Sequence, residues 1–401
     1  MSNDRIPVTV LSGSLGAGKT TVLNHVLTAD HGLDVAVVVN DMGDVNVDAE
    51  HVTQQSDLGG EEEIIELSNG CICCRLRGDM LDEVGRLADR REFDYLLVES
   101  SGISEPIPVA QTFAMGFEDA EFDPTDTYVL DTMVTVANAH SFWESFDSGE
   151  ALAAETPTGE SGRVPETVLL DQIEFCDVLL LNKCDLVPDD ALDEIEAVLE
   201  RLQPRAKIVR TEFGNVDPDE ILGTERFDFQ EASNSAGWKH ELQHDHHHDP
   251  QEEHGVTSFV YERRRPFHPE RIAQLLSELP DELIRAKGFF WSAGREDVAM
   301  GVDKAGPSVR AGPSGQWLAN LPEAEREQYF AARPGLEDDW DEEWGDRMTR
   351  LVFIGREFDD ETLIERLDDC VLTDREMNDD WSTYDDPFEP EERRELALAN
   401  E

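Results

Sequence analysis

Residues 13–20 carry a pattern typical of a phosphate-binding loop. They spell GSLGAGKT, which fits the phosphate-loop pattern GxxxxGK[ST], between a predicted strand and a predicted helix. Glycines let backbone N–H groups wrap phosphates, and a helix N-terminus adds positive potential. Lys19 would reach the β- and γ-phosphates, and the Thr20 hydroxyl would hold Mg²⁺. We therefore predict a nucleotide site formed here by Gly13, Ser14, Gly16, Ala17, Gly18, Lys19, Thr20 and Thr21.

A second pattern concerns the choice of base. Asn182, Lys183 and Asp185 form an NKxD element at the end of the predicted strand Val178–Asn182. The Asp185 carboxylate can accept hydrogen bonds from the ring N–H and the amine of guanine, whereas adenine would offer it an acceptor. A buried polar site rejects a ligand that leaves it unpaired. The element therefore predicts guanine, with a plain turn at a strand end as the alternative.

Glu99 and Gly102 belong to the sequence ESSG, which ends the predicted strand Tyr95–Glu99. An acidic residue at a strand end beside a phosphate loop is a usual partner of Mg²⁺. The backbone N–H of Gly102 could meet the γ-phosphate. We predict that Lys19, Thr20 and Glu99 support hydrolysis, the alternative for Glu99 being a strand cap.

Three cysteines, Cys71, Cys73 and Cys74, fall within four residues, after Asn69 and Gly70. Thiolates bind soft or borderline metals, and three of them can hold a tetrahedral Zn²⁺ if a fourth ligand comes from elsewhere. A redox pair and small core residues are the alternatives. Such close spacing makes a poor disulfide framework and fits a reducing cytoplasm. Cys176 and Cys370 lie in apolar patterns and are predicted to be core.

Six histidines and several carboxylates crowd residues 240–254. Clusters of this kind bind Zn²⁺, Ni²⁺ or Co²⁺ loosely, and a solvated charged loop is the alternative. The only dense basic cluster, Arg263 to Arg265, is expected to form ion pairs rather than an anion site.

These residues need a scaffold. Apolar, β-branched runs predict strands, and helical patterns between them predict a parallel sheet covered on both faces, followed by a small α+β domain. The expected strands are Val8–Leu11, Val35–Asn40, Tyr95–Glu99, Val178–Asn182 and Ile208–Arg210 in the first region, and Thr257–Arg263, Lys287–Ser292 and Arg350–Gly355 in the second. The expected helices are Thr20–Leu27, Met80–Arg90, Pro269–Leu279 and Asp360–Leu367.

Domain limits follow from changes in composition. We expect a nucleotide-binding domain over 1–228 with an acidic insertion near 148–163, a His-rich linker over 229–256, a C-terminal domain over 257–375 and an acidic tail over 376–401. No stretch approaches the roughly 18 apolar residues of a membrane span, and the N-terminus lacks a signal-peptide pattern. We therefore expect a cytoplasmic protein.

The charge balance is extreme. The 401 residues hold 33 basic and 90 acidic side chains, a formal net charge of −57, and only six of the basic ones are lysine. This surface suits a halophilic source, because salt screens the self-repulsion within about 3 Å at roughly 1 M. It argues against binding to nucleic acid or anionic membranes, which needs a basic footprint.

Taken together, GSLGAGKT, ELSNGCICCRL (66–76), ESSG, LNKCDL and FVYERRRPFHPERI (259–272) resemble the CobW-type GTPases. That family is related to the nickel-insertion GTPases. The resemblance spans about 6–375. It implies a P-loop GTPase domain with a mainly parallel sheet, followed by a smaller α+β CobW C-terminal domain. It also implies GTP and Mg²⁺ as ligands, and Zn²⁺ or Co²⁺ at Cys71, Cys73 and Cys74.

The family is regarded as one of metallochaperones, so the resemblance implies a GTP-hydrolysing insertase that delivers metal to a client protein. Cobalt handling for cobalamin synthesis and a non-catalytic zinc buffer are the alternatives, and a P-loop kinase is disfavoured. The sequence departs from the family at 40–44, which read NDMGD instead of NEFGE; Asp44 there is our first choice for the fourth metal ligand. A family Asp is replaced by Asn138. The oligomeric state is left open.

Overall fold

The structure is a computed structural model of the full chain. It describes residues 5–40, 64–67, 84–89, 93–100, 102, 105–115, 122–147, 165–234, 236, 239, 255–332 and 340–388. The chain divides into two compact units, Met1–His240 and Glu241–Glu401.

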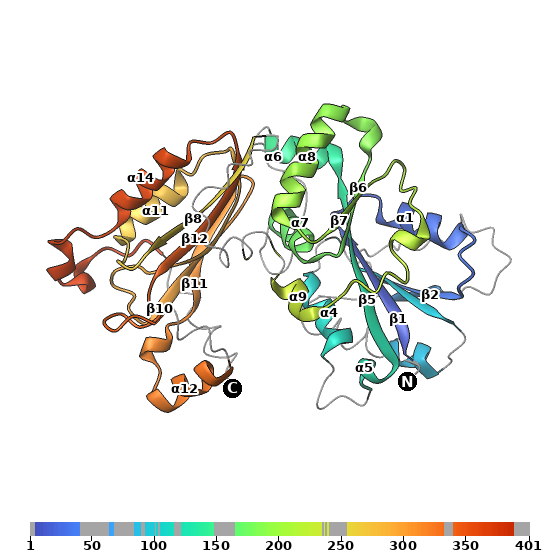
Figure 1. The fold of residues 1–401 in the computed structure, drawn as a ribbon, viewed down its shortest axis with the longest axis horizontal. Coiled ribbons are helices and arrows are strands. Elements are labelled where there is room, and N and C mark those ends of the chain that lie inside the picture. Colours follow the sequence, from blue (N-terminus) through green and yellow to red (C-terminus); the bar gives the residue numbers. More distant parts are fainter. Residues whose placement is uncertain are drawn as a thin grey trace. The chain divides into compact units, whose positions relative to one another are not determined.

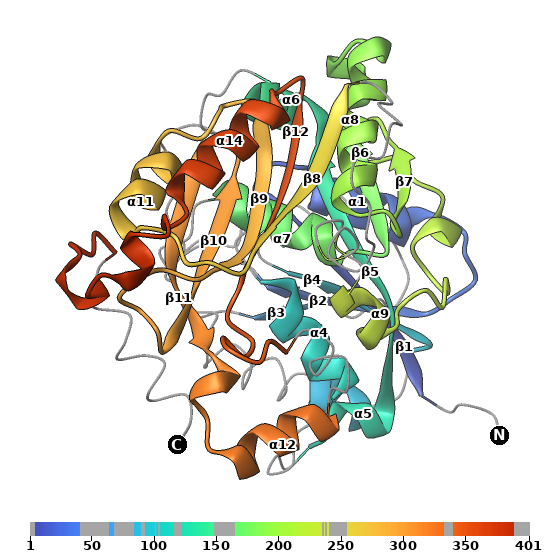
Figure 2. The same ribbon diagram turned by 60° about the vertical axis from the view of Figure 1, so that its left-hand side comes forward.

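The first unit is built on a seven-stranded sheet with the order β3-β2-β4-β1-β5-β6-β7. Figure 1 shows this unit with several of its strands labelled, and Figure 2 labels all of them. Every described pairing in it is parallel, so the carboxyl ends of the strands share one edge. The runs of valine and leucine are buried, as expected of strands covered on both faces. The strands are β1 (Ile6–Gly13), β2 (Val35–Asn40), β3 (Ile64–Leu67), β4 (Tyr95–Glu99), β5 (Tyr128–Asn138), β6 (Val178–Asn182) and β7 (Lys207–Arg210).

Two apolar cores sandwich this sheet. On one face, Val22, Leu23 and Val26 of α1 (Lys19–Thr28) pack with Val37 and Leu97 of the strands. The opposite face packs against helical residues 84–89, α4 (Pro106–Ala114) and Phe175 at the end of α7 (Pro165–Phe175). The other helices are α5 (Pro124–Thr127), α6 (Ala139–Asp147), α8 (Asp189–Leu202) and α9 (Phe229–Asn234), with 3₁₀ turns η1 (Cys184–Leu186) and η2 (Pro218–Glu220).

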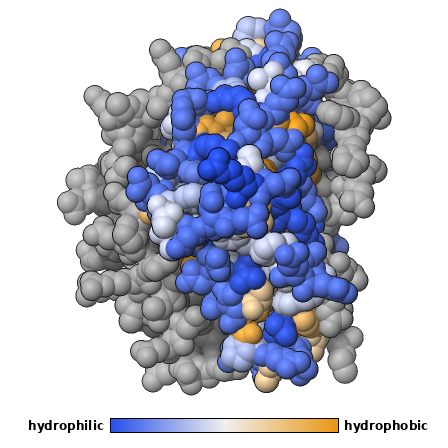
Figure 3. Space-filling view, turned by 90° about the vertical axis from the view of Figure 1, so that its left-hand side faces the viewer, coloured by the Kyte–Doolittle hydropathy of each residue, from blue (hydrophilic) through white to orange (hydrophobic). Residues whose placement is uncertain are grey.

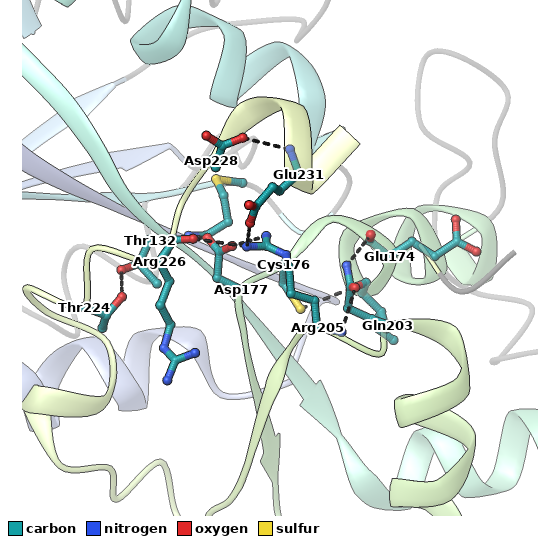
Figure 4. Close-up of polar contacts among 12 residues, drawn as sticks. Thr132, Glu174, Cys176, Asp177, Gln203, Arg205, Thr224, Arg226, Asp228 and Glu231 are labelled. Carbon is teal, nitrogen blue, oxygen red and sulfur yellow. Dashed lines mark hydrogen bonds and ion pairs between the residues drawn. The ribbon is translucent and has the colours of Figure 1, made fainter. Parts of the chain in front are cut away.

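A buried carboxylate fixes the amino-terminal side of this sheet. Asp177, directly before β6, accepts from the Met133 N–H of β5 at 2.8 Å and from the Arg205 guanidinium (Figure 4). Arg205 also donates to the Arg226 carbonyl oxygen at 3.1 Å and faces Glu231 of α9 at 3.9 Å. Burial raises the pKa of Asp177, and the Met133 N–H and Arg205 oppose this effect. The pair therefore ties α9 to the strands, away from the carboxyl edge.

The second unit holds a five-stranded antiparallel sheet with the order β11-β10-β9-β12-β8. Helices α11 and α14 lie side by side on one face of it (Figure 2), where Ile272 and Leu367 enter the core with Phe353 of β12. The elements are β8 (Val256–Arg263), α11 (Pro269–Ser277), β9 (Leu283–Phe290), β10 (Val298–Ala305), β11 (Ser308–Gln316), η3 (Leu318–Asn320), α12 (Glu323–Ala332), β12 (Thr349–Arg356), α14 (Asp360–Cys370), η4 (Glu376–Asn378) and η5 (Trp381–Thr383).

Two segments differ from the sequence-based expectation. The start of the expected linker, Phe229–Asn234, is helix α9, and Phe229 packs against the first core. The start of the expected tail is also folded: Arg295 donates to Asp386 and to the Phe388 carbonyl oxygen, both at 2.5 Å. Phe388 packs against the second core, so the folded part of this unit extends at least that far.

The basic cluster forms ion pairs, as expected. Arg263 pairs with Asp368 and Arg265 with Asp374, at 2.8 and 2.7 Å. The surface in Figure 3 is mostly hydrophilic, with small separate hydrophobic patches. Among the described residues, no helix has the length and apolar character needed to cross a membrane.

Candidate nucleotide site

Three strand ends bring the predicted nucleotide residues to one edge. β1 ends at Gly13, β4 at Glu99 and β6 at Asn182, and β1 pairs in parallel with β4 and β5 while β5 pairs with β6. In open α/β sheets, ligands bind outside the carboxyl ends of the strands. The register therefore places all three motifs where a nucleotide site of this fold belongs.

The glycines of the phosphate loop are required by their surroundings. Gly13 has φ +139°, and a Cβ there would lie 2.2 Å from the Val136 carbonyl oxygen. Gly18 has φ +108°, and its Cβ would lie 2.3 Å from Asn182 Nδ2. Real Cβ contacts are not this short, so only glycine lets the loop lie against β5 and β6.

Lys19 and Thr20 begin helix α1 at the end of the loop. Lys19 is buried, and its Nζ donates to the carbonyl oxygens of Gly13 at 3.0 Å and Ser14 at 3.3 Å. These bonds hold the ammonium across the loop, where phosphate oxygens can compete for it. Ser14, Gly16 and Ala17 lie within the same turn, and Thr21 is exposed on the first turn of the helix.

An oxygen pair lies beside the loop. The Thr20 hydroxyl donates to Glu99 Oε1 at 3.4 Å, and Glu99 is buried at the end of β4. Hydroxyl and carboxylate oxygens are the donors that Mg²⁺ prefers, so this pair fits that ion. Gly102 lies against the loop, since a Cβ there would be 2.8 Å from the Leu15 nitrogen.

Asn182 links three segments at the far end of the site. Its Nδ2 donates to the Ala17 carbonyl oxygen at 2.8 Å, and its Oδ1 accepts from Thr211 Oγ1 and from the Gly214 N–H, both at 3.0 Å. Thr211 and Gly214 were not singled out from the sequence. Gly214 has φ +70°, and a Cβ there would lie 2.9 Å from the Val22 nitrogen of α1. The one sequence signal for Gly214 is its place shortly after the predicted strand Ile208–Arg210.

The rest of the NKxD element forms the tight turn η1. Lys183 has φ +62°, which is uncommon for a residue with a side chain and turns the chain sharply after β6. Cys184 points inward, where burial raises the pKa of its thiol. Asp185 is exposed. The turn therefore fixes the backbone on both sides of Asp185 and leaves the carboxylate accessible.

Asn138 occupies the equivalent position on β5, directly opposite Asn182 in register. Its Oδ1 accepts from the N–H groups of His140 at 3.1 Å and Ser141 at 3.3 Å, so it caps the N-terminus of α6.

The predicted metal residues Cys71, Cys73, Cys74 and Asp44, and the histidines of 240–254, lie outside the described residues. Within the described ranges, no group of three or more His, Cys, Asp or Glu side chains could hold a metal ion. Cys176 and Cys370 are buried, as expected for core residues. Burial raises the pKa of the Cys370 thiol to about 11, so it is not a thiolate at neutral pH.

Comparison with known protein families identifies the family of this chain. Residues 7–210 match the CobW/HypB/UreG nucleotide-binding domain, and residues 256–371 match the cobalamin synthesis protein CobW C-terminal domain. The chain belongs to the CobW family. The resemblance drawn from the motifs is confirmed, and so is the fold class: a parallel-sheet P-loop GTPase-type domain followed by a separate CobW C-terminal domain.

Zinc appears in the names of several relatives of this CobW-family chain. It is 40% identical over 410 residues to the zinc-regulated GTPase metalloprotein activator 1 of Dictyostelium discoideum, covering 98% of this chain and 86% of that protein. It is 27% identical to the zinc chaperone YjiA of Escherichia coli, covering 89% and 96%. The crystal structure of Zn(II)-bound YjiA GTPase matches 92% of this chain and 99% of that one, with 23% identity and a TM-score of 0.41.

Proposed function

We propose that this protein is a GTP-hydrolysing metal chaperone that binds Zn²⁺, or Co²⁺, and delivers it to a client protein. The main support for nucleotide binding is that Lys19, the Thr20–Glu99 pair and the hydrogen bonds of Asn182 all lie at one edge of the sheet. The names of the relatives support the metal part.

In the proposed reaction, the phosphate-loop N–H groups and Lys19 hold the β- and γ-phosphates of GTP. Thr20 and Glu99 are the residues that would hold Mg²⁺, which supplies charge neutralisation on the phosphate oxygens when bound. Gly102 keeps its backbone close to the loop, where its N–H can meet the γ-phosphate. Asp185 accepts from guanine, while Lys183 and Asn182 fix the turn that carries it.

The proposed cargo is one metal ion bound by Cys71, Cys73 and Cys74, with Asp44 as the fourth ligand. Asp44 follows β2, and the cysteines precede β4, whose end supplies Glu99. The described ends of β2 and β4, between which the cysteines lie in sequence, are at the nucleotide edge of the sheet. Binding of GTP and binding of metal would then influence each other, and the influence must be reciprocal.

The base preference is tested by nucleotide titration. GTP is expected to bind at least about 100-fold more tightly than ATP, or about 2.7 kcal/mol. Asp185→Asn should weaken GTP binding and favour xanthosine triphosphate, because the amide offers a donor to the new ring carbonyl. Asp189→Asn, an exposed acid on α8, is the matched control and should change neither affinity. Equal affinity of the unmodified protein for ATP and GTP would contradict the assignment.

A measurement of GTP hydrolysis distinguishes a GTP-dependent chaperone from a passive zinc buffer. Zinc should stimulate GTP hydrolysis by the unmodified protein, and Lys19→Ala should lose most nucleotide binding and turnover. A metal-loaded protein that binds GTP without turning it over would favour the buffer.

A further inference from the structure

The turn at residues 212–215, next to the base-reading element, has an unusual backbone. The Asn215 N–H donates to the Glu212 carbonyl oxygen at 3.0 Å, and the two residues between them have positive φ, +54° at Phe213 and +70° at Gly214. Positive φ at both central positions is the pattern of a type I′ turn, which favours glycine, asparagine and aspartate. Gly214 fits this preference, whereas the bulky Phe213 does not, so the backbone at Phe213 is strained.

Strained residues of this kind gather beside the base-reading element. Of the four described non-glycine residues with positive φ, Lys183 and Phe213 lie on the two segments that flank Asn182, and Glu225 and Glu357 lie elsewhere in the chain. Backbone strain persists where the surrounding structure imposes it, and it is concentrated at ligand sites. The strain at Phe213 therefore calls for a function of its side chain.

The side chain of Phe213 is not part of an apolar core. It is 69% exposed, and it is the only exposed phenylalanine among those whose burial the structure describes. Gly214, the next residue, is buried. An exposed aromatic ring on a strained backbone gains little from packing within the folded chain, so its benefit is expected to come from a ligand that covers it.

Three contacts hold the turn between the phosphate loop and the base-reading element. Thr211 Oγ1 and the Gly214 N–H, on either side of Phe213, both donate to Asn182 Oδ1 at 3.0 Å. The Thr211 carbonyl oxygen accepts from the Cys184 N–H at 3.2 Å, which joins the turn to η1. Gly214 also lies against the first turn of α1, since a Cβ there would be 2.9 Å from a backbone nitrogen of that helix. A nucleotide that reaches from the phosphate loop to the base-reading element passes beside this turn.

We propose that the ring of Phe213 stacks on the guanine base and forms one wall of the nucleotide site. Every base presents a π-face, so stacking adds affinity without choosing among bases, and Asp185 supplies the choice through hydrogen bonds. The strained turn holds the ring in place before the nucleotide arrives, which lowers the entropic cost of binding. This inference rests on the proposed function, because it requires a guanine nucleotide at this edge of the sheet.

The test is a calorimetric titration of the full chain, with Mg²⁺, using GDP, inosine diphosphate and inorganic tripolyphosphate as probes. Inosine diphosphate lacks the amine that Asp185 reads, and tripolyphosphate lacks a base. Phe213→Asn removes the ring, and asparagine tolerates positive φ, so the turn is kept. This variant should bind GDP and inosine diphosphate about tenfold more weakly, or about 1.4 kcal/mol, and tripolyphosphate as before. The preference for GDP over inosine diphosphate should stay the same, which a mere distortion of the turn would not preserve.

A second variant provides a spectroscopic signal. Phe213→Trp keeps an aromatic ring and should retain GDP affinity. Its fluorescence, taken as the difference from the unmodified protein, should be quenched by GDP and not by tripolyphosphate, because a stacked guanine quenches indole. Tyr329→Asn removes another exposed aromatic ring, on α12, and is the control that should change no affinity.

The possible failures are distinguishable. Unchanged GDP affinity in Phe213→Asn, an equal loss of tripolyphosphate binding, a reduced preference for GDP over inosine diphosphate, or Phe213→Trp fluorescence that GDP leaves unchanged would each overturn the stacking role and leave the proposed function standing. If the unmodified protein bound no GDP, the proposed function would be overturned together with this inference.

Discussion

At the scale of single residues, Asn182 does more than its place in a base-reading motif suggests. Its side chain joins the phosphate loop, the end of β6 and the turn at 211–214 through three hydrogen bonds. The two ends of a bound nucleotide would therefore be held by parts of one connected network. Gly18 and Gly214 allow this network, because a Cβ at either would lie within 3 Å of a neighbouring nitrogen atom.

Asn182→Ala should lower the free energy of unfolding by about 2–3 kcal/mol, because it leaves buried polar groups unpaired. It should also weaken GTP binding, since the loop and the guanine element lose their connection. Chemical denaturation and nucleotide titration measure the two effects.

Asn138→Ala is the matched control, because Asn138 lies opposite Asn182 but only caps α6. It should cost about 1 kcal/mol of stability and leave GTP affinity unchanged. The same loss of GTP affinity in both variants would refute the special role of Asn182.

At the scale of elements, the sequence predicts the strands whose residues are continuously apolar, and misses β10 and β11, whose residues are not. Val35–Asn40, Tyr95–Glu99 and Val178–Asn182 agree with the structure because strands buried on both faces need such runs. The hairpin of β10 and β11 has no such signature: Ser308–Gln316 contains two glycines and a proline and is mostly partly exposed.

The same reasoning applies to the candidate site. The glycines, Lys19 and Asn182 are recognisable because their spacing is local. The bond from Thr211 to Asn182 joins residues 29 positions apart, and the packing of Phe388 on the second core depends on the tertiary fold. Neither leaves a periodic pattern that the sequence displays.

β10 carries a buried cation that gives the second unit a specific pH response. Lys304 is 1% exposed and donates to the Gly306 carbonyl oxygen. Burial lowers its pKa to about 8, partly opposed by Asp281 and Glu282. The unfolded chain keeps this proton up to about pH 10.4, so it binds more protons than the folded chain between these values. Lys304 should therefore make stability rise from about pH 8 to 10.

Lys304→Met should remove this rise. The unfolding free energy of the variant minus that of the unmodified protein should fall as pH increases from 7 to 10, by an amount on the order of 2–3 kcal/mol. Urea denaturation at several pH values measures it. A difference independent of pH would show that Lys304 keeps its proton in the folded state.

At the scale of the whole molecule, the charge of −57 is the dominant property. This net value already counts the arginines of ion pairs such as those of Arg263 and Arg265, so 57 acidic side chains have no basic counterpart. Exposed ion pairs themselves contribute only about 0–1 kcal/mol each. Repulsion among the remaining carboxylates opposes folding, and salt screens it.

The melting temperature should therefore rise by several degrees or more between about 0.1 and 2 M KCl. Sucrose of equal osmolality is the control, because it is excluded from the surface without screening charge. If sucrose gave the whole increase, or if KCl lowered the melting temperature, charge repulsion would not be the cause.

In the proposed function, metal binding and GTP binding are coupled in one molecule. The most direct measurement is a Co²⁺ titration of the full chain with a non-hydrolysable GTP analogue and Mg²⁺, and again with GDP. We predict one tight Co²⁺ with near-ultraviolet thiolate absorption, bound about tenfold more tightly with the GTP analogue, or about 1.4 kcal/mol. Replacing Cys71, Cys73 and Cys74 by Ser should abolish both the band and the coupling while nucleotide still binds. Equal Co²⁺ affinity in both nucleotide states would contradict the coupling, and an unchanged spectrum in the triple Ser variant would contradict the cysteine site.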